Sequence, residues 1–498
     1  MNKNKIFFLF ILIVLLGTFL RFYNIGAESF WLDEGATALT IKSHTVKEIF
    51  YNTATKGQIL PEYYESSTDL PPYYVVLKIW SNIFGLSEAS LRSLSAIFGS
   101  LSIIIVYLLS KELFNQKVSL IAALIMSLNT VMIEYSQEAR LYSSLILIVL
   151  LSGYSLIKYS KTNRNTYLAA FTISNLIGIY LHYPFVFFII FEGIYVFYPA
   201  FNEFIKKRKL NIKKIHYPFI LFFIAYLTLL YRILNLKLVA THFAGSLSFS
   251  KLAKIFLQFN TWIYPSEGLR LKLNNSQFQL FGLYDWLLIL SVVLIVIFLS
   301  VFFIKGILDI KSKKQKSLIF LISWLILPLL AALVVLYSSF ATFGSIRPVI
   351  FIVPAYLIIA SYGFSTLKNK NLAALLIVFS VLSIIPLVAY YSNVNNPQYR
   401  ESALFLEDNI KKNDLVIANI QTVTVPFAYY SDNLVDADGI SNVEDAKKVS
   451  DGKDSVWLAL SATKYSDPKG LIRAYFDENF RLEETRRFYD VELLYYTR

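Results

Sequence analysis

Long apolar runs alternate with short charged stretches along most of this chain. Three of the clearest runs cover Ile6–Leu20, Trp286–Ile304 and Leu318–Leu336. Each is long enough to cross a hydrocarbon core of about 30 Å as a helix. If every apolar run crosses once, the chain makes about eleven membrane spans. We place them at residues 6–22, 93–110, 118–134, 141–157, 167–182, 184–200, 217–234, 284–304, 317–338, 347–366 and 372–391.

The first run has the basic start of a signal peptide, with Lys3 and Lys5 before the apolar residues. A cleavage site would need small residues after the run, but Arg21, Phe22 and Tyr23 follow it. We therefore interpret this run as a retained first span with its N-terminus in the cytoplasm.

Basic residues lie mainly in the short loops between these spans. Starting from a cytoplasmic N-terminus, alternation of the spans places all of these loops on the cytoplasmic side, as the positive-inside rule requires. The rule accounts for the net charge of +13 and argues against a nucleic-acid partner. The chain has no cysteine, which excludes disulfides and thiolate metal sites. The basic loop residues are Lys111, Lys117, Lys158, Lys161, Arg164, Lys206–Lys209, Lys213, Lys214, Lys305, Lys311–Lys316 (with Ser312 and Gln315 between), Lys368 and Lys370.

Two loops of the predicted transmembrane domain, residues 1–391, fall outside the membrane, at 23–92 and 235–283. In the first loop, Thr45 and Glu48 have the spacing of a capping box at a helix start. Pro71 and Pro72 suit the first turn of a helix that continues to about Ile83. This helix is short and carries tyrosines, a tryptophan and Lys78, so we expect it to lie on the membrane surface.

Residues 392–498 have the composition of a small soluble α/β domain outside the membrane. We expect helices at Tyr399–Lys411 and Asp467–Asn479. Strands are expected at Asp414–Ile420 and Ser455–Leu460, with further strand-like residues up to Tyr496. The predicted fold class is an α-helical polytopic membrane protein with a small C-terminal extracytoplasmic α/β domain.

Ionisable residues near the outer ends of spans are the candidates for chemistry, because such groups are costly at membrane depth and usually functional. Asp33 and Glu34 follow the first span, and one of them could be a general base for an acceptor hydroxyl. They could equally form the acidic start of a helix. Asp69, before the proline pair, is either a ligand or a helix cap.

A second group lies in later external turns. Arg140 has the position of a guanidinium that clamps a phosphate, with Glu138 beside it. The alternative is an interfacial ion pair at a helix end. His182 and Arg347 lie at the outer ends of their spans, where each could bind a ligand or anchor the helix at the interface. Glu192 falls inside a span, where we expect a protonated or paired structural residue.

These clusters resemble the polytopic glycosyltransferases of the GT-C class, most closely the bacterial branch related to protein O-mannosyltransferases and lipid A aminoarabinose transferases. The resemblance covers about residues 20 to 370, and the C-terminal domain matches only in placement and style. Two residues depart from the family pattern: Leu70 stands where His or Lys is common, and Pro348 where Tyr is common. The matching motifs are Asp33-Glu34, Pro71 to Tyr74, Leu91-Arg92 through Phe98-Gly99, Glu138 to Tyr142, His182-Tyr183, and Arg347-Pro348 to Pro354.

The resemblance implies a cell-membrane enzyme that moves a sugar from a polyprenyl-phosphate donor to a lipid, glycan or protein acceptor on the outer side, with inversion. Asp33 would be the base, with Glu34 in support and Glu138 as a further catalytic candidate. The remaining implied ligands are Arg140, Arg347 and Arg92 for the donor phosphate, and Asp69, Tyr73, Tyr142 and His182 for substrate.

The resemblance implies that Glu138 and Asp69 position the sugar, the acceptor or a divalent cation, and the sequence shows no dedicated metal site. The alternative from another class is a transporter or flippase of lipid-linked glycans, for which Glu192 is the best support. Membrane lipids are partners in both cases.

Overall fold

The computed structural model describes residues 3–51, 71–208, 211–235, 249–274, 276–313, 315–338, 346–434 and 437–498. The described residues form two compact units. The first, which we call the helical unit, takes its residues from 1–23, 68–73 and 93–393. The second, the sheet unit, takes its residues from 24–67, 74–92 and 394–498. The expected domain boundary at residues 391 and 392 stays a prediction, and the sheet unit combines much of the first loop with the C-terminal residues.

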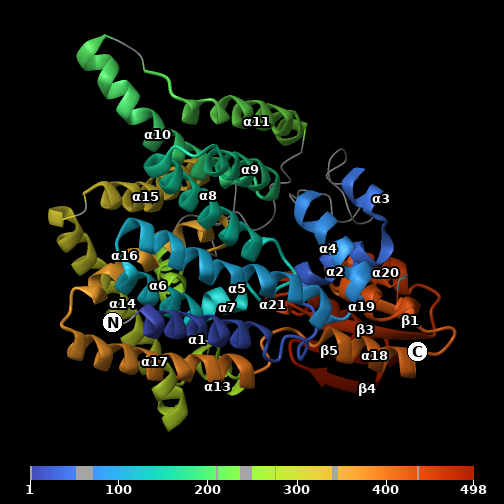
Figure 1. The fold of residues 1–498 in the computed structure, drawn as a ribbon. Coiled ribbons are helices and arrows are strands. Elements are labelled where there is room, and N and C mark those ends of the chain that lie inside the picture. Colours follow the sequence, from blue (N-terminus) through green and yellow to red (C-terminus); the bar gives the residue numbers. More distant parts are fainter. Residues whose placement is uncertain are drawn as a thin grey trace. The chain divides into compact units, whose positions relative to one another are not determined.

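Helices make up the helical unit (Figure 1). Every span predicted from the sequence falls on one or two of these helices. The helices of this unit are α1 (Lys3–Phe22), α5 (Glu88–Leu113), α6 (Gln116–Leu128), α7 (Thr130–Glu134), α8 (Tyr142–Thr162), α9 (Asn165–Leu181), α10 (Phe185–Lys207), η2 (Lys214–His216), α11 (Pro218–Asn235), α12 (Phe249–Asn260), α13 (Glu267–Asn274), η3 (Phe278–Leu280), α14 (Leu283–Lys313), α15 (Gln315–Ser338), η4 (Arg347–Ile352), α16 (Val353–Ser365) and α17 (Asn369–Ser392).

Six helices of the described chain are long and apolar enough to cross a membrane: α1, α5, α8, α10, α14 and α17. Four shorter apolar segments lie in α6, in η2 with α11, in α15 and in η4 with α16. The multi-pass membrane character is therefore confirmed, while the number of crossings stays a prediction.

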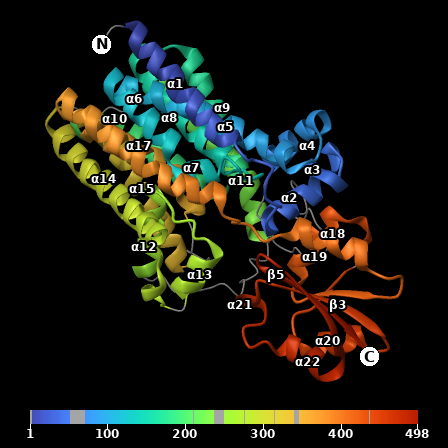
Figure 2. The ribbon, with the colours of Figure 1, turned by 90° about the horizontal axis from the view of Figure 1, so that it is seen from below.

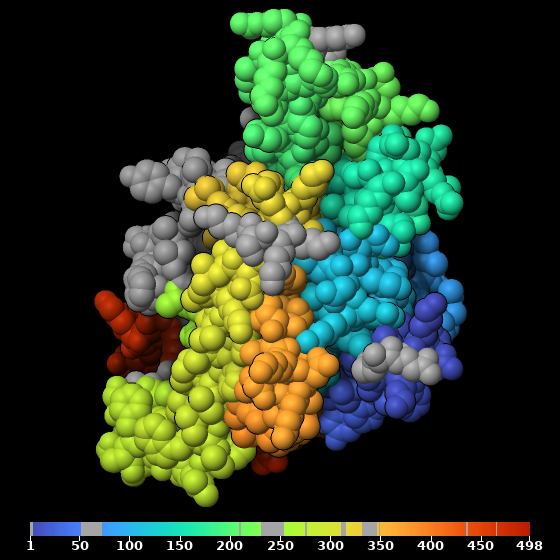
Figure 3. Space-filling view, turned by 60° about the vertical axis from the view of Figure 1, so that its left-hand side comes forward, coloured from blue at the N-terminus to red at the C-terminus, as the bar shows by residue number. Residues whose placement is uncertain are grey.

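Burial separates inner from outer helices in this unit. Every residue of α16 from Val353 to Phe364 is buried, and α16 packs against α6 and α14. The outer helices α14 and α17 lie side by side in Figures 2 and 3 and expose apolar side chains such as Ile297 and Ile377. Since a bilayer is as apolar as these side chains, this exposure is typical of lipid-facing surface.

The sheet unit contains three helices from the first loop and the whole C-terminal α/β domain. Its elements are α2 (Leu32–Ser43), α3 (Val46–Tyr51), α4 (Pro71–Phe84), α18 (Tyr399–Asn409), β1 (Leu415–Ala418), α19 (Gln421–Tyr430), η5 (Asp432–Leu434), β2 (Asp438–Gly439), α20 (Val443–Ser450), β3 (Ser455–Ser461), α21 (Thr463–Ser466), α22 (Leu471–Asn479), β4 (Arg481–Phe488) and β5 (Val491–Thr497).

The five strands have the order β2-β1-β3-β5-β4. β1 pairs in parallel with β2 and β3, with Ile417 opposite Leu458, and β5 pairs antiparallel with β3 and β4. Alternate residues of the central strands point to opposite faces, so both faces carry an apolar core. Figure 2 shows α18 and α19 on one face and α20 and α22 on the other.

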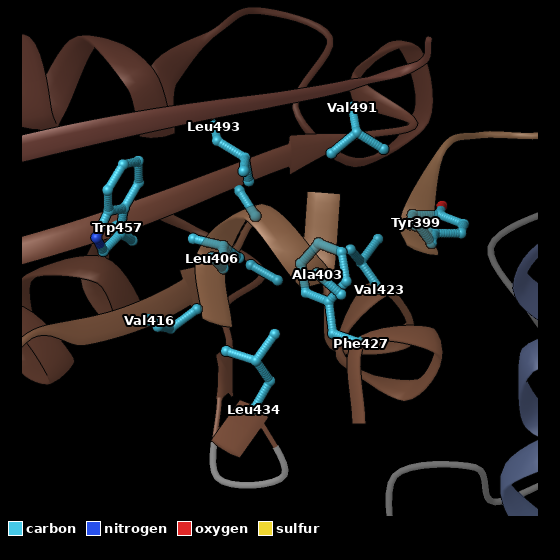
Figure 4. Packing of buried hydrophobic residues seen from close by; sticks show 12 residues of the cluster. Tyr399, Ala403, Leu406, Val416, Val423, Phe427, Leu434, Trp457, Val491 and Leu493 are labelled. Carbon is cyan, nitrogen blue, oxygen red and sulfur yellow. The ribbon is translucent and has the colours of Figure 1, made fainter. Parts of the chain in front are cut away.

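Figure 4 shows the core under α18 and α19. Leu406 of α18 and Phe427 of α19 point toward the sheet residues Val416, Trp457 and Leu493, and all five side chains are buried. α19 also packs against α2 of the first loop. The C-terminal domain therefore contributes to holding the segment that carries Asp33 and Glu34.

Most local predictions for the sheet unit are confirmed. Glu48 accepts the backbone N–H of Thr45 at 2.8 Å, and the Thr45 hydroxyl accepts the N–H of Glu48, which completes the capping box. The helix expected from Pro71 is α4, whose place on the membrane surface stays a prediction. The helix expected to begin at Asp467 is α22, which begins four residues later at Leu471. Asp467 lies before the helix, where its carboxylate accepts the backbone N–H groups of Leu471 and Ile472.

Candidate functional site

An ion pair between two segments far apart in the sequence lies at the centre of the candidate site in the helical unit. Glu138 belongs to the turn between α7 and α8, and Arg347 is the first residue of η4. Nη2 of Arg347 lies 3.7 Å from Oε1 of Glu138. The Glu138 side chain is 11 % exposed and the Arg347 side chain 30 % exposed. The guanidinium is thus paired with a carboxylate, and the Arg347 side chain is only partly buried.

Two aromatic rings extend this cluster. The guanidinium carbon of Arg347 lies 5.7 Å from the ring centroid of Tyr142, within the range of a cation–π contact. Tyr142 begins α8, and its ring meets the ring of His182 edge-on at 6.3 Å. His182 lies directly after α9. The structure therefore brings together four residues singled out in the sequence, Glu138, Tyr142, His182 and Arg347.

The Ser95 hydroxyl connects the side chain of Tyr73 to the backbone of Arg140. The Tyr73 hydroxyl lies 2.9 Å from the hydroxyl of Ser95, which in turn donates to the backbone carbonyl of Arg140 at 3.1 Å. Tyr73 is buried, while Arg140 is partly exposed. This contact gives Tyr73 a role in holding the turn that carries Glu138 and Arg140.

The start of the same turn is anchored by buried polar groups. The Gln137 amide nitrogen donates to the carbonyls of Arg21 and Tyr23 at 3.0 and 2.8 Å, and its oxygen accepts from Tyr390. Nε of Arg21 donates to the Ser136 hydroxyl. Gly99 on α5 makes room for this arrangement, since a Cβ there would lie 2.1 Å from the Ser136 oxygen. These contacts preorganise the backbone before Glu138.

Residues of the second loop fix the chain around Arg347. The Gln258 side chain accepts the backbone N–H of Ile346, the residue before Arg347, at 3.1 Å. The Asn260 side-chain oxygen accepts a hydrogen bond from the Tyr356 hydroxyl in α16. Tyr264, farther along, donates to Glu134 at 2.8 Å. None of these residues was singled out in the sequence, because isolated amides and tyrosines near an apolar run give no distinctive signal.

In the sheet unit, Asp33 and Glu34 lie in the first turn of α2. Glu34 is buried and forms a bidentate pair with Arg92 of α5, at 2.9 Å from Nε and 2.7 Å from Nη2. Arg92 also donates to the carbonyls of Ile25, Glu28 and Ser29.

These contacts use all five N–H donors of the Arg92 guanidinium. Arg92 was a candidate ligand of the donor phosphate, but a phosphate would have to displace bonds that fix the first loop. We therefore assign Arg92 and Glu34 to the support of this loop. Asp33 is half-buried, which leaves part of its side chain accessible.

Two further candidates have different outcomes. Asp69 lies outside the described residues. Glu192 is fully buried in α10, where it accepts the Ser152 hydroxyl of α8 at 2.6 Å, and Asn175 of α9 donates to the same hydroxyl. Within the described ranges, no group of three or more His, Cys, Asp or Glu side chains is arranged to hold a metal ion.

Comparisons with known proteins agree with this architecture. Residues 69–232 match the family of dolichyl-phosphate-mannose-protein mannosyltransferases. No curated protein sequence matches the chain significantly. The crystal structure of ArnT from Cupriavidus metallidurans bound to undecaprenyl phosphate is similar at a TM-score of 0.57 and 11 % identity, over 99 % of this chain and 98 % of that chain.

Oligosaccharyltransferase structures from Archaeoglobus fulgidus are also similar. The apo form has a TM-score of 0.56 and 15 % identity, over 92 % of this chain and 70 % of that chain. The AglB complex with an inhibitory peptide and a dolichol-phosphate has a TM-score of 0.52 and 12 % identity, over 92 % and 69 % of the two chains. The resemblance to the GT-C class is confirmed by these matches, through the family model for residues 69–232 and through the fold for the chain as a whole.

Proposed function

We propose, from the GT-C fold of this chain, that it is a membrane glycosyltransferase that takes a sugar from a polyprenyl-phosphate donor. The acceptor is a hydroxyl of a lipid, glycan or protein on the outer side of the cell membrane. The observation that carries this proposal is the partly exposed Arg347, held between Glu138 and Tyr142. A fixed guanidinium of this kind is suited to bind a phosphate group.

Arg347 and Arg140 are the proposed ligands of the donor phosphate. When the bond between the sugar and the phosphate breaks, negative charge develops on the phosphate oxygen that leaves. Preorganised cations stabilise this charge more strongly in a site of low dielectric than in water. The polar contacts that fix Gln137 and Ile346 on either side of the cluster support this preorganisation. The proposed contacts of the donor near its phosphate or sugar are Tyr142, which lies against Arg347, and His182, which lies against Tyr142.

Asp33 is the proposed base, on the strength of the sequence motif and of its half-buried position in the first turn of α2. The acceptor oxygen attacks the anomeric carbon from the face opposite the phosphate, and its proton passes to Asp33. A new glycosidic bond forms as polyprenyl phosphate leaves, so the anomeric configuration is inverted. Glu34 cannot share this role while it is paired with Arg92 in a buried bidentate contact.

The test is turnover by the purified protein in nanodiscs with radiolabelled polyprenyl-phosphate sugars, following the release of polyprenyl phosphate. We expect turnover in the wild type and its loss in Asp33→Asn, with donor binding retained. Arg347→Lys keeps the charge but loses the planar fork, so we expect the donor affinity to fall about tenfold. A parallel series with EDTA tests whether a divalent cation takes part.

Two results would contradict the proposal. Movement of the lipid between leaflets without release of polyprenyl phosphate would identify a transporter. Turnover that is unchanged in Asp33→Asn would keep the enzyme class but assign the base to another residue, with Glu138 next.

Arg164→Lys is the matched control for Arg347→Lys, because Arg164 is an exposed arginine just before α9. We expect this control to leave the donor affinity unchanged.

A further inference from the structure

The backbone between α1 and α2 has no regular secondary structure, so its polar groups need partners from elsewhere. Arg400 of α18 supplies two of them, since its Nη2 donates to the carbonyl of Ala27 at 2.8 Å and its Nη1 to that of Gly26 at 3.5 Å. Nη1 also lies 2.8 Å from the Glu88 carboxylate. A side chain of the C-terminal domain therefore fixes the middle of this short segment, residues 23–31.

Tyr430, the last residue of α19, fixes the end of the same segment, just before α2. Its hydroxyl accepts the backbone N–H of Phe30 at 2.7 Å and lies 3.0 Å from Oε1 of Glu88, to which it donates. Burial raises the pKa of Tyr430, so the hydroxyl keeps the proton that this bond requires. The Phe30 ring is fully buried and stacks on the Tyr430 ring at 6.3 Å. Phe30 is three residues before Asp33.

A third contact joins the loop to the chain that leads into the C-terminal domain. Glu28 accepts the backbone N–H groups of Asn395 and Asn396 at 2.9 and 3.1 Å, and the Ser29 hydroxyl donates to the Pro397 carbonyl at 2.6 Å. Burial raises the pKa of Glu28, against the opposing effect of these hydrogen bonds.

Together with the Arg92 bonds, these contacts give every backbone carbonyl from Ile25 to Ser29 a side-chain donor. Such a loop loses little freedom when substrate binds, because its conformation is fixed beforehand. Glu88 is the shared point, since its Oε1 is bonded to both Arg400 and Tyr430.

We propose that Tyr430 and Arg400 are positioning residues, through which the C-terminal domain holds the loop of Asp33 in its reactive conformation. This inference rests on the proposed function, because it assigns a use to the geometry of Asp33. Loosening the loop should slow the transfer step. It should leave donor binding unchanged, because that binding is assigned to Arg347 and Arg140.

The experiment compares Tyr430→Phe with Tyr475→Phe in the full chain in nanodiscs. Tyr430→Phe removes the bonds to Phe30 and Glu88 and keeps the ring. The control removes a hydroxyl that contacts Ser450 on the other side of the sheet. For Tyr430→Phe we expect kcat to fall about tenfold, since small misplacements of a reacting group have large effects. The KM for the donor should stay the same, and amides 25–31 should exchange hydrogen faster. For Tyr475→Phe we expect no change in these measurements.

Faster exchange with unchanged kcat, or unchanged exchange, would overturn the positioning role while leaving the transferase in place. A parallel fall in donor affinity would also overturn it. Arg400→Gln, which acts on the same loop through Gly26 and Ala27, should repeat the pattern. Absence of turnover in the wild type would instead contradict the proposed function, and the exchange measurement keeps the two failures distinct.

Discussion

Asp33 and Glu34 are consecutive residues of α2 with different surroundings. Consecutive side chains of a helix point about 100° apart, so one of the two turns into the protein and the other away from it. Glu34 is fully buried against Arg92, and Asp33 is half-buried. Both carboxylate oxygens of Glu34 accept hydrogen bonds from the Arg92 guanidinium. Accessibility therefore favours Asp33 as the residue that exchanges a proton with substrate.

Arg92→Ala tests the supporting role of this pair. Removing the arginine leaves Glu34 as a buried charge without its partner, which costs about 3–5 kcal/mol. We expect a large fall in the thermal unfolding temperature of the purified protein. Lys161→Ala is the control, since Lys161 pairs with Glu112 at a half-exposed position and should change the free energy of unfolding by about 1 kcal/mol or less. A stable Arg92→Ala variant that has lost affinity for polyprenyl phosphate would restore Arg92 as a donor ligand.

The sequence predicted the identity of several candidate residues better than their contacts. Glu138, Tyr142, His182 and Arg347 were singled out from motifs at the ends of spans, and they do lie together. The pairing of Glu34 with Arg92 could not be predicted, because no pattern links residues that are 58 positions apart. Arg400 and the other C-terminal contacts of the loop were missed for the same reason.

At the scale of elements, a strong hydrophobic period was enough to predict most helices and strands. It failed for α19, whose sequence contains two valines, two threonines and Pro426. β-branched residues and proline are poor helix formers, so packing of Val423 and Phe427 against the sheet decides the outcome there. The helices α12 and α13 of the second loop were also not predicted, since they are short and interrupted by polar residues.

Glu192 connects three helices, because Ser152 of α8 and Asn175 of α9 form its polar neighbourhood. Both neighbours are neutral, and an ionised carboxylate among them would be costly inside a span. We therefore expect Glu192 to carry a proton. Glu192→Gln keeps an acceptor for the Ser152 hydroxyl, so its free energy of unfolding should stay within about 1 kcal/mol of the wild-type value. Glu192→Leu removes the acceptor, and we expect its free energy of unfolding to fall by about 1–3 kcal/mol. A folded Glu192→Gln variant that has lost turnover would contradict a purely structural role for Glu192.

Gly35 of α2 lies against Pro426 of α19. A Cβ at position 35 would lie 2.9 Å from the Pro426 Cβ and 3.2 Å from its Cα, and backbone cannot move aside as a flexible side chain can. We expect Gly35→Ala to lower the free energy of unfolding by about 1–3 kcal/mol through overpacking. Gly268→Ala is the matched control, because nothing lies within 4 Å of its Cβ. Equal unfolding temperatures for the two variants would mean that α2 and α19 are not in close contact.

At the scale of the whole molecule, the proposed reaction requires the sheet unit to lie outside the cytoplasm, where lipid-linked donors replace nucleotide sugars. The orientation rests on the basic residues, which lie in every second loop between the predicted spans and so on one side of the membrane. The predicted order of spans and loops agrees with the order of the helices in the described chain. An additional crossing within the first loop would invert every later loop, so topology is open to a direct experiment.

The absence of cysteine from the sequence makes that experiment clean, since single cysteines can be introduced without background. Lys453→Cys places a thiol at an exposed position between α20 and β3, and Thr162→Cys places one at the exposed C-terminal end of α8. In intact cells, we expect a membrane-impermeant maleimide to label Lys453→Cys. It should label Thr162→Cys only after permeabilisation, which also proves that this thiol reacts. The opposite pattern would put the C-terminal domain in the cytoplasm and contradict an outward-facing transferase, because a single aqueous side must hold both the acceptor and the base.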